Sequence, residues 1–322
     1  MSSTSAIITT YQGRAHLAEA LDSVLAQSVP PAEIVVVDDA STDGTADLAD
    51  EYAAREARIR VIRQPENGGV GAARNRGLRE ARHDVVALLD GDDIWLPTHL
   101  ETVGGLLAEH PDAALAFALV EAFGARSYIW GAALPAGEAV DAFWPSIEQC
   151  VAQTSAVVAR RDALLAVGGY AEDLRQCQDY DLYVRLAKRW PFVCTHAVTV
   201  RYRKHPGQNS SKLQSCRRFE YTARERFFEA ERAERGHEPD YLARLAAAMR
   251  RAYDVRFQNA WSARDQEMLD FLPELAPRIP QGEAVAARWQ RKRPLLPLAR
   301  LWDIVPAPVK SGVRSMRRAV AR

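Results

Sequence analysis

The feature that most constrains this chain is a short apolar run that ends in a cluster of carboxylates. Residues 85–89 are all apolar and begin with two β-branched side chains, and the next four residues are Asp90-Gly91-Asp92-Asp93. A run of this kind is typical of a strand buried on both faces of a parallel sheet. Ligands of such sheets bind at the carboxyl ends of the strands. The junction is therefore the first candidate for a functional site.

The acidic cluster has the spacing of a divalent cation site. Residues two apart in an extended backbone point to the same side, so Asp90 and Asp92 can converge while Gly91 keeps the space between them open. Two carboxylates suit Mg²⁺ or Mn²⁺, because substrate phosphates and water can complete the octahedron. From these residues alone a simple turn is the alternative, since Asp and Gly are common turn residues.

Length and composition indicate a large folded protein with a basic C-terminal end. The chain has 322 residues, 48% of them hydrophobic, which allows one large domain with an appendage or two domains. Its formal net charge is zero, yet the segment from Arg288 to the end holds ten Arg or Lys residues against one acid, Asp303. Four cysteines without a C-x-x-C pair indicate neither a zinc site nor a disulfide framework, and favour a reduced, cytoplasmic setting. The sequence shows neither a signal peptide nor an apolar segment of the roughly 18 residues that span a membrane.

Strands and helices alternate over the first 110 residues. Strands are expected at residues 6–10, 33–37, 60–63 and 85–89. Helices are expected at 17–27, after the turn at 41–45 through about 56, and after the glycine-rich loop at 67–71 through 82. This alternation predicts βαβ units and a mostly parallel sheet. Acid or glycine clusters follow the second, third and fourth strands, at 38–39, 67–71 and 90–93. We expect these clusters to lie along one edge of the sheet.

The pattern is less regular beyond residue 110. Further strands are expected at 113–120, 154–159 and 199–203, short helices at 161–167 and after Asp181 up to 189, and a loop or weak strands over 124–141. Residues 213–272 have a helical pattern with mixed charges that suit solvated helix faces. Prolines then divide the tail into short pieces.

Seven segments carry the pattern of one enzyme family. They are IITTY (7–11), VVVDDASTDG (35–44), GVGAARN (69–75), LDGDD (89–93), GGY (168–170), DYDL (179–182) and YRKH (202–205). Together they resemble the family 2 glycosyltransferases, which transfer a sugar from a nucleotide diphosphate donor. The resemblance implies an α/β protein of the GT-A fold, a mixed and mostly parallel sheet flanked by helices. It implies a GT-A domain at 1–211, with a nucleotide-sugar-binding half (1–110) and an acceptor-binding half (111–211), and a helical C-terminal extension at 212–322.

The resemblance assigns the leaving-group side of the reaction to the acidic cluster. It implies that Asp92 is the main metal ligand, with Asp90 directed toward the ribose or a metal-bound water. Asp93 is assigned to donor binding and is an alternative metal ligand, because the register of the family motif is ambiguous at a double Asp. His205 is implied as a further metal or diphosphate ligand, although a histidine beside proline is otherwise typical of a surface loop.

Further donor-binding residues follow from the same resemblance. Asp39 is expected to accept the imino N–H of the base and Tyr11 to stack on it, whereas packing at a strand end is the alternative for Tyr11. Arg74 is expected to reach the base or diphosphate, unless it is a surface arginine. Thr10 and Gly91 are assigned to the same pocket. An imino N–H occurs in uracil, thymine and guanine, so UDP-, dTDP- or GDP-sugars are expected, with UDP favoured.

The general base is assigned to Asp179. A carboxylate opposite the leaving group can remove the proton of the acceptor hydroxyl during attack, which inverts the anomeric carbon. The chain departs from the family pattern here, because Gln178 stands where these enzymes usually have Glu. Asp181 is interpreted as a helix cap, since Asp is a favoured N-cap residue.

The resemblance thus predicts an inverting glycosyltransferase that depends on Mn²⁺ or Mg²⁺ and acts in bacterial cell-surface polysaccharide assembly. Its expected partners are a nucleotide-sugar and a glycan or lipid-linked acceptor, with no nucleic acid. The basic tail allows contact with the inner face of the plasma membrane, packing on the donor half, or a dimer contact. The alternatives are a non-catalytic sugar-nucleotide-binding protein, suggested by Gln178, or a nucleotidyltransferase, whose triphosphate loop is not found. The sequence names neither sugar nor acceptor.

Overall fold

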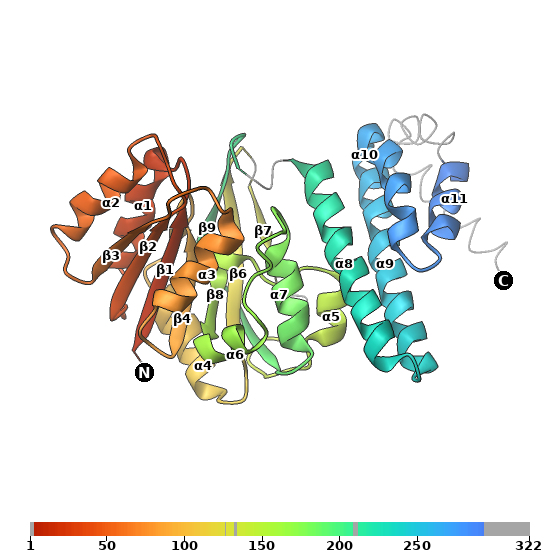
Figure 1. Ribbon diagram of the computed structural model, residues 1–322, viewed down its shortest axis with the longest axis horizontal. Coiled ribbons are helices and arrows are strands. Elements are labelled where there is room, and N and C mark those ends of the chain that lie inside the picture. Colours follow the sequence, from red (N-terminus) through yellow and green to blue (C-terminus); the bar gives the residue numbers. More distant parts are fainter. Residues whose placement is uncertain (1–2, 126, 132–133, 209–211, 293–322) are drawn as a thin grey trace, which may run out of the picture. The chain divides into compact units, whose positions relative to one another are not determined.

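The protein contains one mixed sheet with helices around it (Figure 1). The computed structural model describes residues 3–125, 127–131, 134–208 and 212–292. In these residues nine strands pair in the order β3-β2-β1-β4-β8-β6-β9-β5, with β7 on β6. They are β1 (Thr4–Thr10), β2 (Glu33–Asp38), β3 (Ile59–Arg63), β4 (Val85–Asp90), β5 (Ile94–Trp95), β6 (Leu115–Gly124), β7 (Tyr128–Trp130), β8 (Val157–Arg160) and β9 (Phe192–Lys204). The first four strands are parallel and β8 is antiparallel to β4, which confirms the mixed sheet.

The helices interleave with these strands in the first half of the chain. In the described residues they are α1 (Arg14–Leu25), α2 (Thr45–Ala53), α3 (Val70–Glu80), α4 (Gly105–Glu109), α5 (Phe143–Glu148), α6 (Arg161–Ala166), α7 (Gln178–Ala187), α8 (Leu213–Arg235), α9 (Pro239–Ala263), α10 (Gln266–Phe271) and α11 (Gly282–Lys292). The sequence pattern missed β5, α4 and α5, because elements of two to six residues are too short to show a period. It also placed the start of β9 seven residues too late, at Thr199 instead of Phe192.

Side chains alternate across the parallel strands, and both faces of the sheet are covered. Ile8 of β1 lies in one buried cluster with Leu17 of α1. Val37 of β2 points to the other face, where it packs with Ala73 of α3. Strands covered on both faces have no solvent side, which is why they read as continuous apolar runs.

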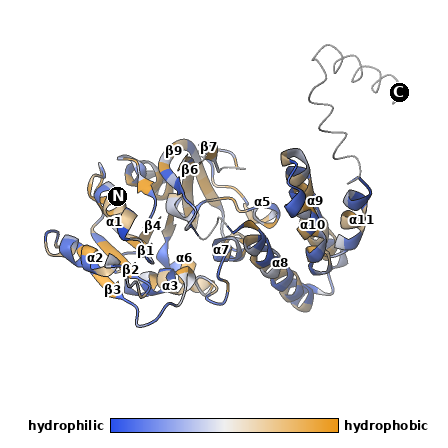
Figure 2. Cartoon of the chain, turned by 90° about the horizontal axis from the view of Figure 1, so that it is seen from above, coloured by the Kyte–Doolittle hydropathy of each residue, from blue (hydrophilic) through white to orange (hydrophobic). Residues whose placement is uncertain are grey.

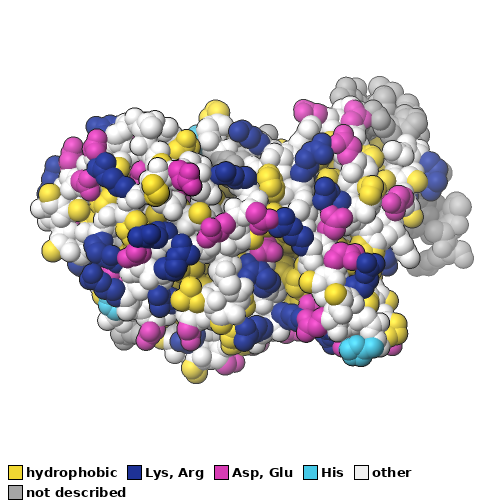
Figure 3. All heavy atoms as spheres, viewed as in Figure 1, with side chains coloured by type: hydrophobic (Ala, Val, Ile, Leu, Met, Phe, Trp, Pro, Cys, Tyr) yellow, Lys and Arg dark blue, Asp and Glu magenta, His cyan; other side chains and the backbone are white. Residues whose placement is uncertain are grey.

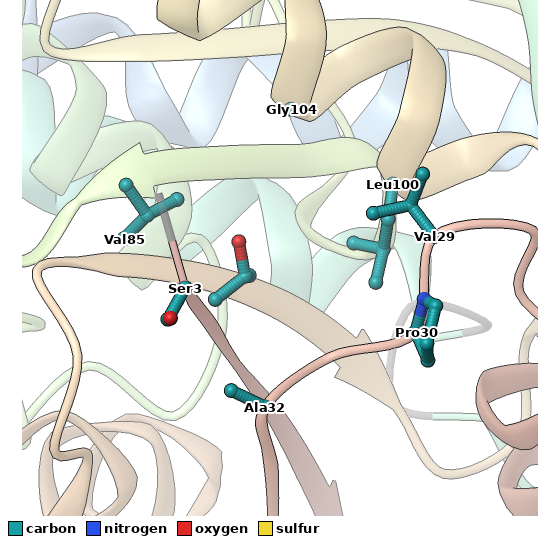
Figure 4. Close-up of a pocket in the computed structure, with 8 residues that line it drawn as sticks. Ser3, Val29, Pro30, Ala32, Val85, Leu100 and Gly104 are labelled. Atoms are coloured by element: carbon teal, nitrogen blue, oxygen red, sulfur yellow. The ribbon is translucent and has the colours of Figure 1, made fainter. Parts of the chain in front are cut away.

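The carboxyl ends of the central strands lie at one edge of the sheet. Register pairs Thr10 with Asp38 and Thr9 with Asp90, so the residues after β1, β2 and β4 emerge together. A pocket lies at the opposite end, where β1 and β4 begin (Figure 4). It is lined by Ser3, Thr4, Val29, Pro30, Ala32, Val85, Leu100 and Gly104, and by none of the predicted site residues.

The described residues form two compact units, one that ends at Ala248 and one that begins at Met249. The unit that holds the sheet therefore extends past the predicted boundary at residue 211. The reason is that α8, a largely hydrophilic helix (Figure 2), still packs on this unit. Its buried Arg224 donates to the carbonyl oxygens of Ile147 and Glu148, the latter at 3.1 Å.

The second unit has its own aromatic contacts. The rings of Phe257 and Trp289 stack with centroids 5.9 Å apart, and the indole N–H of Trp289 donates to Asp254 at 2.5 Å. Basic and acidic side chains are interspersed over the molecular face drawn in Figure 3. Among the described residues no helix is both long and apolar enough to cross a bilayer. Most of the basic tail, residues 293–322, lies outside the described residues, so its predicted contacts stay predictions.

Candidate active site

The segments that follow β1 and β2 are joined by hydrogen bonds. The backbone N–H of Gln12 donates to Ser41 at 2.8 Å, and that of Gly13 donates to Thr45 at 2.9 Å. Gln12 has a φ of 49°, a left-handed value that non-glycine residues adopt at a cost. Tyr11 directly precedes Gln12, and 53% of its surface is exposed. Its ring is thus available for contact with a planar ligand.

Asp39 connects the end of β2 to the glycine-rich loop before α3. One carboxylate oxygen accepts from the Gly68 N–H at 2.8 Å and from Gln64 at 2.5 Å, and the other accepts from the Gly69 N–H at 2.8 Å. Asp39 is 3% exposed. The structure therefore shows it holding this loop, while its predicted contact with a base stays a prediction.

The turn after β4 is tightly packed against the end of β1. The Gly91 N–H donates to the carbonyl oxygen of Thr9 at 2.9 Å. A Cβ at Gly91 would lie 2.9 Å from the Cβ of Thr10, so a larger residue would not fit without displacement. The hydroxyl of Thr10 is buried and has no hydrogen-bond partner within the described part of the chain. The side chain of Thr10 thus packs closely against the turn.

Asp90 forms an ion pair with a buried arginine. Its Oδ1 accepts from Nη2 of Arg74 at 2.6 Å, and the Arg74 guanidinium lies 5.2 Å from the ring centre of Tyr170. Asn75, the next residue of α3, donates to the carbonyl of Tyr170 and accepts from its N–H, both at 2.8 Å. These bonds fix Tyr170 beneath Arg74. The surface alternative for Arg74 is wrong, because only 6% of the residue is exposed.

Asp92 and His205 come together from distant parts of the chain. Their side chains lie 3.0 Å apart, and each is about one quarter exposed, at 25% and 28%. Burial raises the pKa of Asp92, the nearby Asp90 raises it further, and His205 opposes the shift. Two carboxylates in such a setting favour a cation between or beside them.

The neighbouring Asp93 has a different environment. It is fully buried at 0% exposure, and one oxygen accepts from Ser155 at 2.6 Å and Gln153 at 3.0 Å. Its other oxygen accepts from the Arg203 N–H at 2.9 Å. This placement argues against the predicted donor contact of Asp93 and against its alternative role as a metal ligand. The residue instead connects the turn after β4 to β8 and β9.

Asp179 lies in the first turn of α7 and faces the same site. Its Oδ1 accepts from the Tyr180 N–H at 2.8 Å, and its Oδ2 lies 3.9 Å from the thiol of Cys150. Burial raises the pKa of Asp179, and Arg74 and Asp90 act on it with opposite signs. Through the charges of these two residues, Asp179 is electrostatically coupled to the acidic cluster. A carboxylate with a raised pKa is a better proton acceptor than an ordinary one.

The residues present are chemically suited to a divalent metal. Asp90 and Asp92 offer carboxylate oxygens and His205 an imidazole nitrogen, a set that Mn²⁺ accepts when phosphate oxygens supply further ligands. Within the described ranges no three His, Cys, Asp or Glu side chains are already arranged as a metal site. Any metal would thus be held jointly by the protein and by the donor diphosphate.

Sequence reasoning missed the residues that support the site. Ser155 and Gln153 hold Asp93, and Asn75 holds Tyr170, although the sequence pattern gave none of them a role. Asn75 and Tyr170 lie in two of the seven recognised segments, which is the only signal that could have found them. Ser155 and Gln153 precede β8 in the weakly patterned half of the chain and carry no such signal.

Comparison with known proteins connects this geometry to a family. The model described as glycosyl transferase family 2 matches residues 5–165. A putative teichuronic acid biosynthesis glycosyltransferase of Bacillus subtilis, TuaG, is 42% identical over 97 residues, which are 30% of this chain and 38% of TuaG. The succinoglycan biosynthesis protein ExoW of Rhizobium meliloti is 49% identical over 90 residues, 26% of this chain and 27% of ExoW. The matched segments thus span less than two fifths of either relative.

Solved structures share the fold over nearly the whole chain. S. aureus TarS 1-349 in complex with UDP-GlcNAc has a TM-score of 0.68 at 21% identity, covering 94% of this chain and 88% of that one. The mannosyltransferase PcManGT from Pyrobaculum calidifontis, in complex with GDP-Man and Mn²⁺, has a TM-score of 0.57 at 17% identity with the same coverage. At these identities the likeness establishes the GT-A fold. Together with the match over residues 5–165, it shows that the chain belongs to glycosyl transferase family 2.

Proposed function

We propose that this chain is a metal-dependent, inverting glycosyltransferase that moves a sugar from a UDP-sugar to a hydroxyl of a glycan or lipid-linked acceptor. We also propose that it acts in the assembly of a bacterial cell-surface polysaccharide. The observation that carries the proposal is the convergence of Asp90, Asp92 and His205 at one edge of the sheet, within electrostatic reach of Asp179 through Arg74 and Asp90. Relatives named for teichuronic acid and succinoglycan biosynthesis support the polysaccharide role.

The leaving group of this reaction is a nucleoside diphosphate. Asp92 and His205, with Asp90 behind them, would hold the metal, which when bound supplies Lewis-acid stabilisation of the diphosphate charge. Arg74 keeps the carboxylate of Asp90 oriented through their 2.6 Å ion pair. Because the guanidinium is buried, this orientation is maintained with little competition from water.

The acceptor hydroxyl needs a proton acceptor, and Asp179 has the properties of one. Burial favours its neutral form and so raises its affinity for a proton. Arg74 opposes that rise in pKa and so favours the ionised form of Asp179, which is the form that can act as a base. Gln178 next to it is 3% exposed and carries no charge, so in this chain Asp179 works without a second acid at that position.

The nucleobase is proposed to bind where β1 and β2 end. Tyr11 is exposed there, and Asp39, which holds the Gly68–Gly69 backbone, donates its own N–H to the carbonyl oxygen of Thr10 at 2.9 Å. UDP is favoured over other bases with an imino N–H because the TarS structure of the same fold contains UDP-GlcNAc. The mannosyltransferase with GDP-Man and Mn²⁺ makes a GDP-sugar the second candidate.

The decisive experiment is a thermal-shift screen of the full chain against UDP-, dTDP- and GDP-linked sugars, each with and without Mn²⁺. We expect one donor to raise Tm, and Mn²⁺ to increase that rise. The best donor is then incubated with the protein, and release of nucleoside diphosphate is followed. No stabilisation by any donor would contradict the proposal. Stabilisation without any turnover of that donor, in the presence of candidate glycan acceptors, would instead support a non-catalytic binding protein.

The membrane contact of the basic tail is a separate part of the proposal. It depends on residues 293–322, which lie outside the described residues, so its support is their composition alone. We expect the full chain to sediment with vesicles that contain anionic lipid, and a chain that ends at Lys292, the last residue of α11, to stay in the supernatant. Equal behaviour of the two proteins would contradict the contact.

A further inference from the structure

Two cysteines from distant parts of the sequence lie together next to the candidate base. Cys177 directly precedes α7, and Cys216 lies in the first turn of α8. Their Sγ atoms are 3.2 Å apart, and Sγ of Cys177 lies 3.3 Å from the carbonyl oxygen of Cys216. Both residues are half-buried. Asp179 follows Cys177 by two residues.

We propose that Cys177 and Cys216 form a reversible dithiol–disulfide pair whose oxidation lowers sugar transfer. The effect on transfer rests on the role proposed above for Asp179. The thiol chemistry itself does not depend on that role, so the two parts can be tested separately.

The oxidant belongs to the class of small disulfides, such as oxidised glutathione. The Cys216 thiolate attacks one sulfur of the reagent, which forms a mixed disulfide and releases the first small thiolate. Cys177 then attacks the Cys216 sulfur and releases the second. One disulfide of the reagent is reduced to two thiols, and the two protein thiols are oxidised to one disulfide. The protons of the two cysteines pass to the released thiolates.

The surroundings favour Cys216 as the attacking residue. The Cys177 thiol beside it and the positive charge of Arg217 lower the pKa of Cys216. The same contact and burial raise the pKa of Cys177, which makes it the residue that resolves the mixed disulfide. The thiolate is the nucleophile in such exchange.

Bond formation would act on the position of Asp179. A disulfide needs a sulfur separation of about 2.05 Å, so the two sulfur atoms must approach from 3.2 Å. The α8 side is held by the buried Arg224, which contacts two α5 carbonyls and lies 4.5 Å from the Tyr180 ring. Arg224 thus links α8 to both α5 and α7, and closing the sulfur gap has to act on the backbone at Cys177, two residues before Asp179. A displacement of about 1 Å at a catalytic group can cost about 100-fold in rate.

The chain supplies a matched control. Cys194 is also a free cysteine, but it is fully buried and its thiol contacts the carbonyl oxygens of Leu134 and Pro135 at 3.5 and 3.3 Å. It lies on β9, away from the α7–α8 contact. Cys194→Ala should therefore leave both the disulfide and its effect unchanged.

The test uses the full chain in glutathione buffers that range from fully reduced to fully oxidised. Free thiols are alkylated, the protein is digested, and linked peptides are identified by mass spectrometry. We expect a Cys177–Cys216 linked peptide in the oxidised buffers, its loss after reduction, and no link in Cys216→Ser or Cys216→Ala. In parallel, kcat for transfer should fall by about tenfold or more on oxidation, with KM for the donor unchanged, and recover on reduction.

The controls separate the possible failures. The kcat of Cys216→Ser should not respond to oxidation, whereas Cys194→Ala should respond like the wild type. The proposal is overturned if only a glutathione adduct forms on Cys216, if no link appears in the fully oxidised buffer, or if the link forms while kcat stays the same. If the reduced protein transfers no sugar, the proposed function fails, and mass spectrometry still decides whether the disulfide forms.

Discussion

The acidic cluster after β4 and the acid at the start of α7 are built in opposite ways. Asp90 and Asp92 are almost adjacent in sequence and owe their position to the end of one strand. Asp179 depends on residues far from it along the chain, since Arg74 and Asp90 act on its charge and Cys150 contacts its carboxylate. The first site is therefore local and the second is assembled by packing. In the local site, activity should fall only when a carboxylate itself is substituted. In the assembled site, activity should also change when residues packed around the acid are substituted.

The largest effect should come from Asp179→Asn. Loss of the base should lower kcat by about 10²- to 10⁴-fold while donor affinity is retained, because Asp179 is assigned to the acceptor side. Initial rates and donor-induced thermal shifts measure the two properties. Asp162→Asn is the matched control, since Asp162 also lies in the first turn of a helix but is exposed. Weaker donor binding by Asp179→Asn with an unchanged kcat would place Asp179 on the donor side instead.

Asp92→Asn should have the next largest effect. Loss of one carboxylate beside His205 should remove the additional Tm rise that Mn²⁺ gives with the donor, and lower kcat by about 100-fold. Calorimetric titration of Mn²⁺ in the presence of nucleoside diphosphate gives a measure that does not depend on turnover. If Asp92→Asn keeps the full response to Mn²⁺, the metal is held elsewhere.

Asp93→Asn should separate stability from binding within the same cluster. Asp93 is buried and accepts three hydrogen bonds, so replacement should reduce the free energy of unfolding by about 1–3 kcal/mol. Donor binding with Mn²⁺ should persist at temperatures where the variant is folded. Urea unfolding measures the first quantity, and Ser155→Ala, which removes one of the donors to Asp93, should show a smaller loss. If Asp93→Asn left the free energy of unfolding unchanged but abolished donor binding, Asp93 would be a donor-binding residue.

The smallest expected effect is a displacement of the pH profile. The base must be ionised, so kcat should fall as pH drops through the raised pKa of Asp179. Arg74 lowers that pKa, so in Arg74→Gln the acidic limb of the kcat profile should move to higher pH. Arg76→Gln, on the same helix but 47% exposed and paired with Glu80, should leave the limb in place. A limb that does not move in Arg74→Gln would show that another group titrates.

The strands of the first half were predictable to within a few residues. Each of β1, β2 and β4 is a short apolar run with both faces covered, and such a run has few other ways to bury itself. The second half was less predictable. The start of β9 was missed because Thr195 and His196 interrupt its apolar pattern; Thr195 is partly exposed and His196 is exposed.

The residues of the candidate site also differ in how far the sequence predicted their positions. Parallel strands end at one edge, so the placement of Asp39, Asp90 and Asp92 followed from strand positions in the sequence. The pairing of Asp92 with His205 was expected only from the resemblance to a family. The burial of Asp93 was not expected, because adjacent carboxylates look alike in a sequence.

The sequence by itself determined which residues could lie at the edge of the sheet, since the periods of strands and helices are local properties. Only the tertiary structure decided which of them face the open site and which are buried, as Asp92 and Asp93 show. It also decided that Cys177 and Cys216 meet, although their spacing suggested no pair. The physical reason is that burial, charge and contact depend on segments distant in the chain, and local periodicity carries no information about those segments.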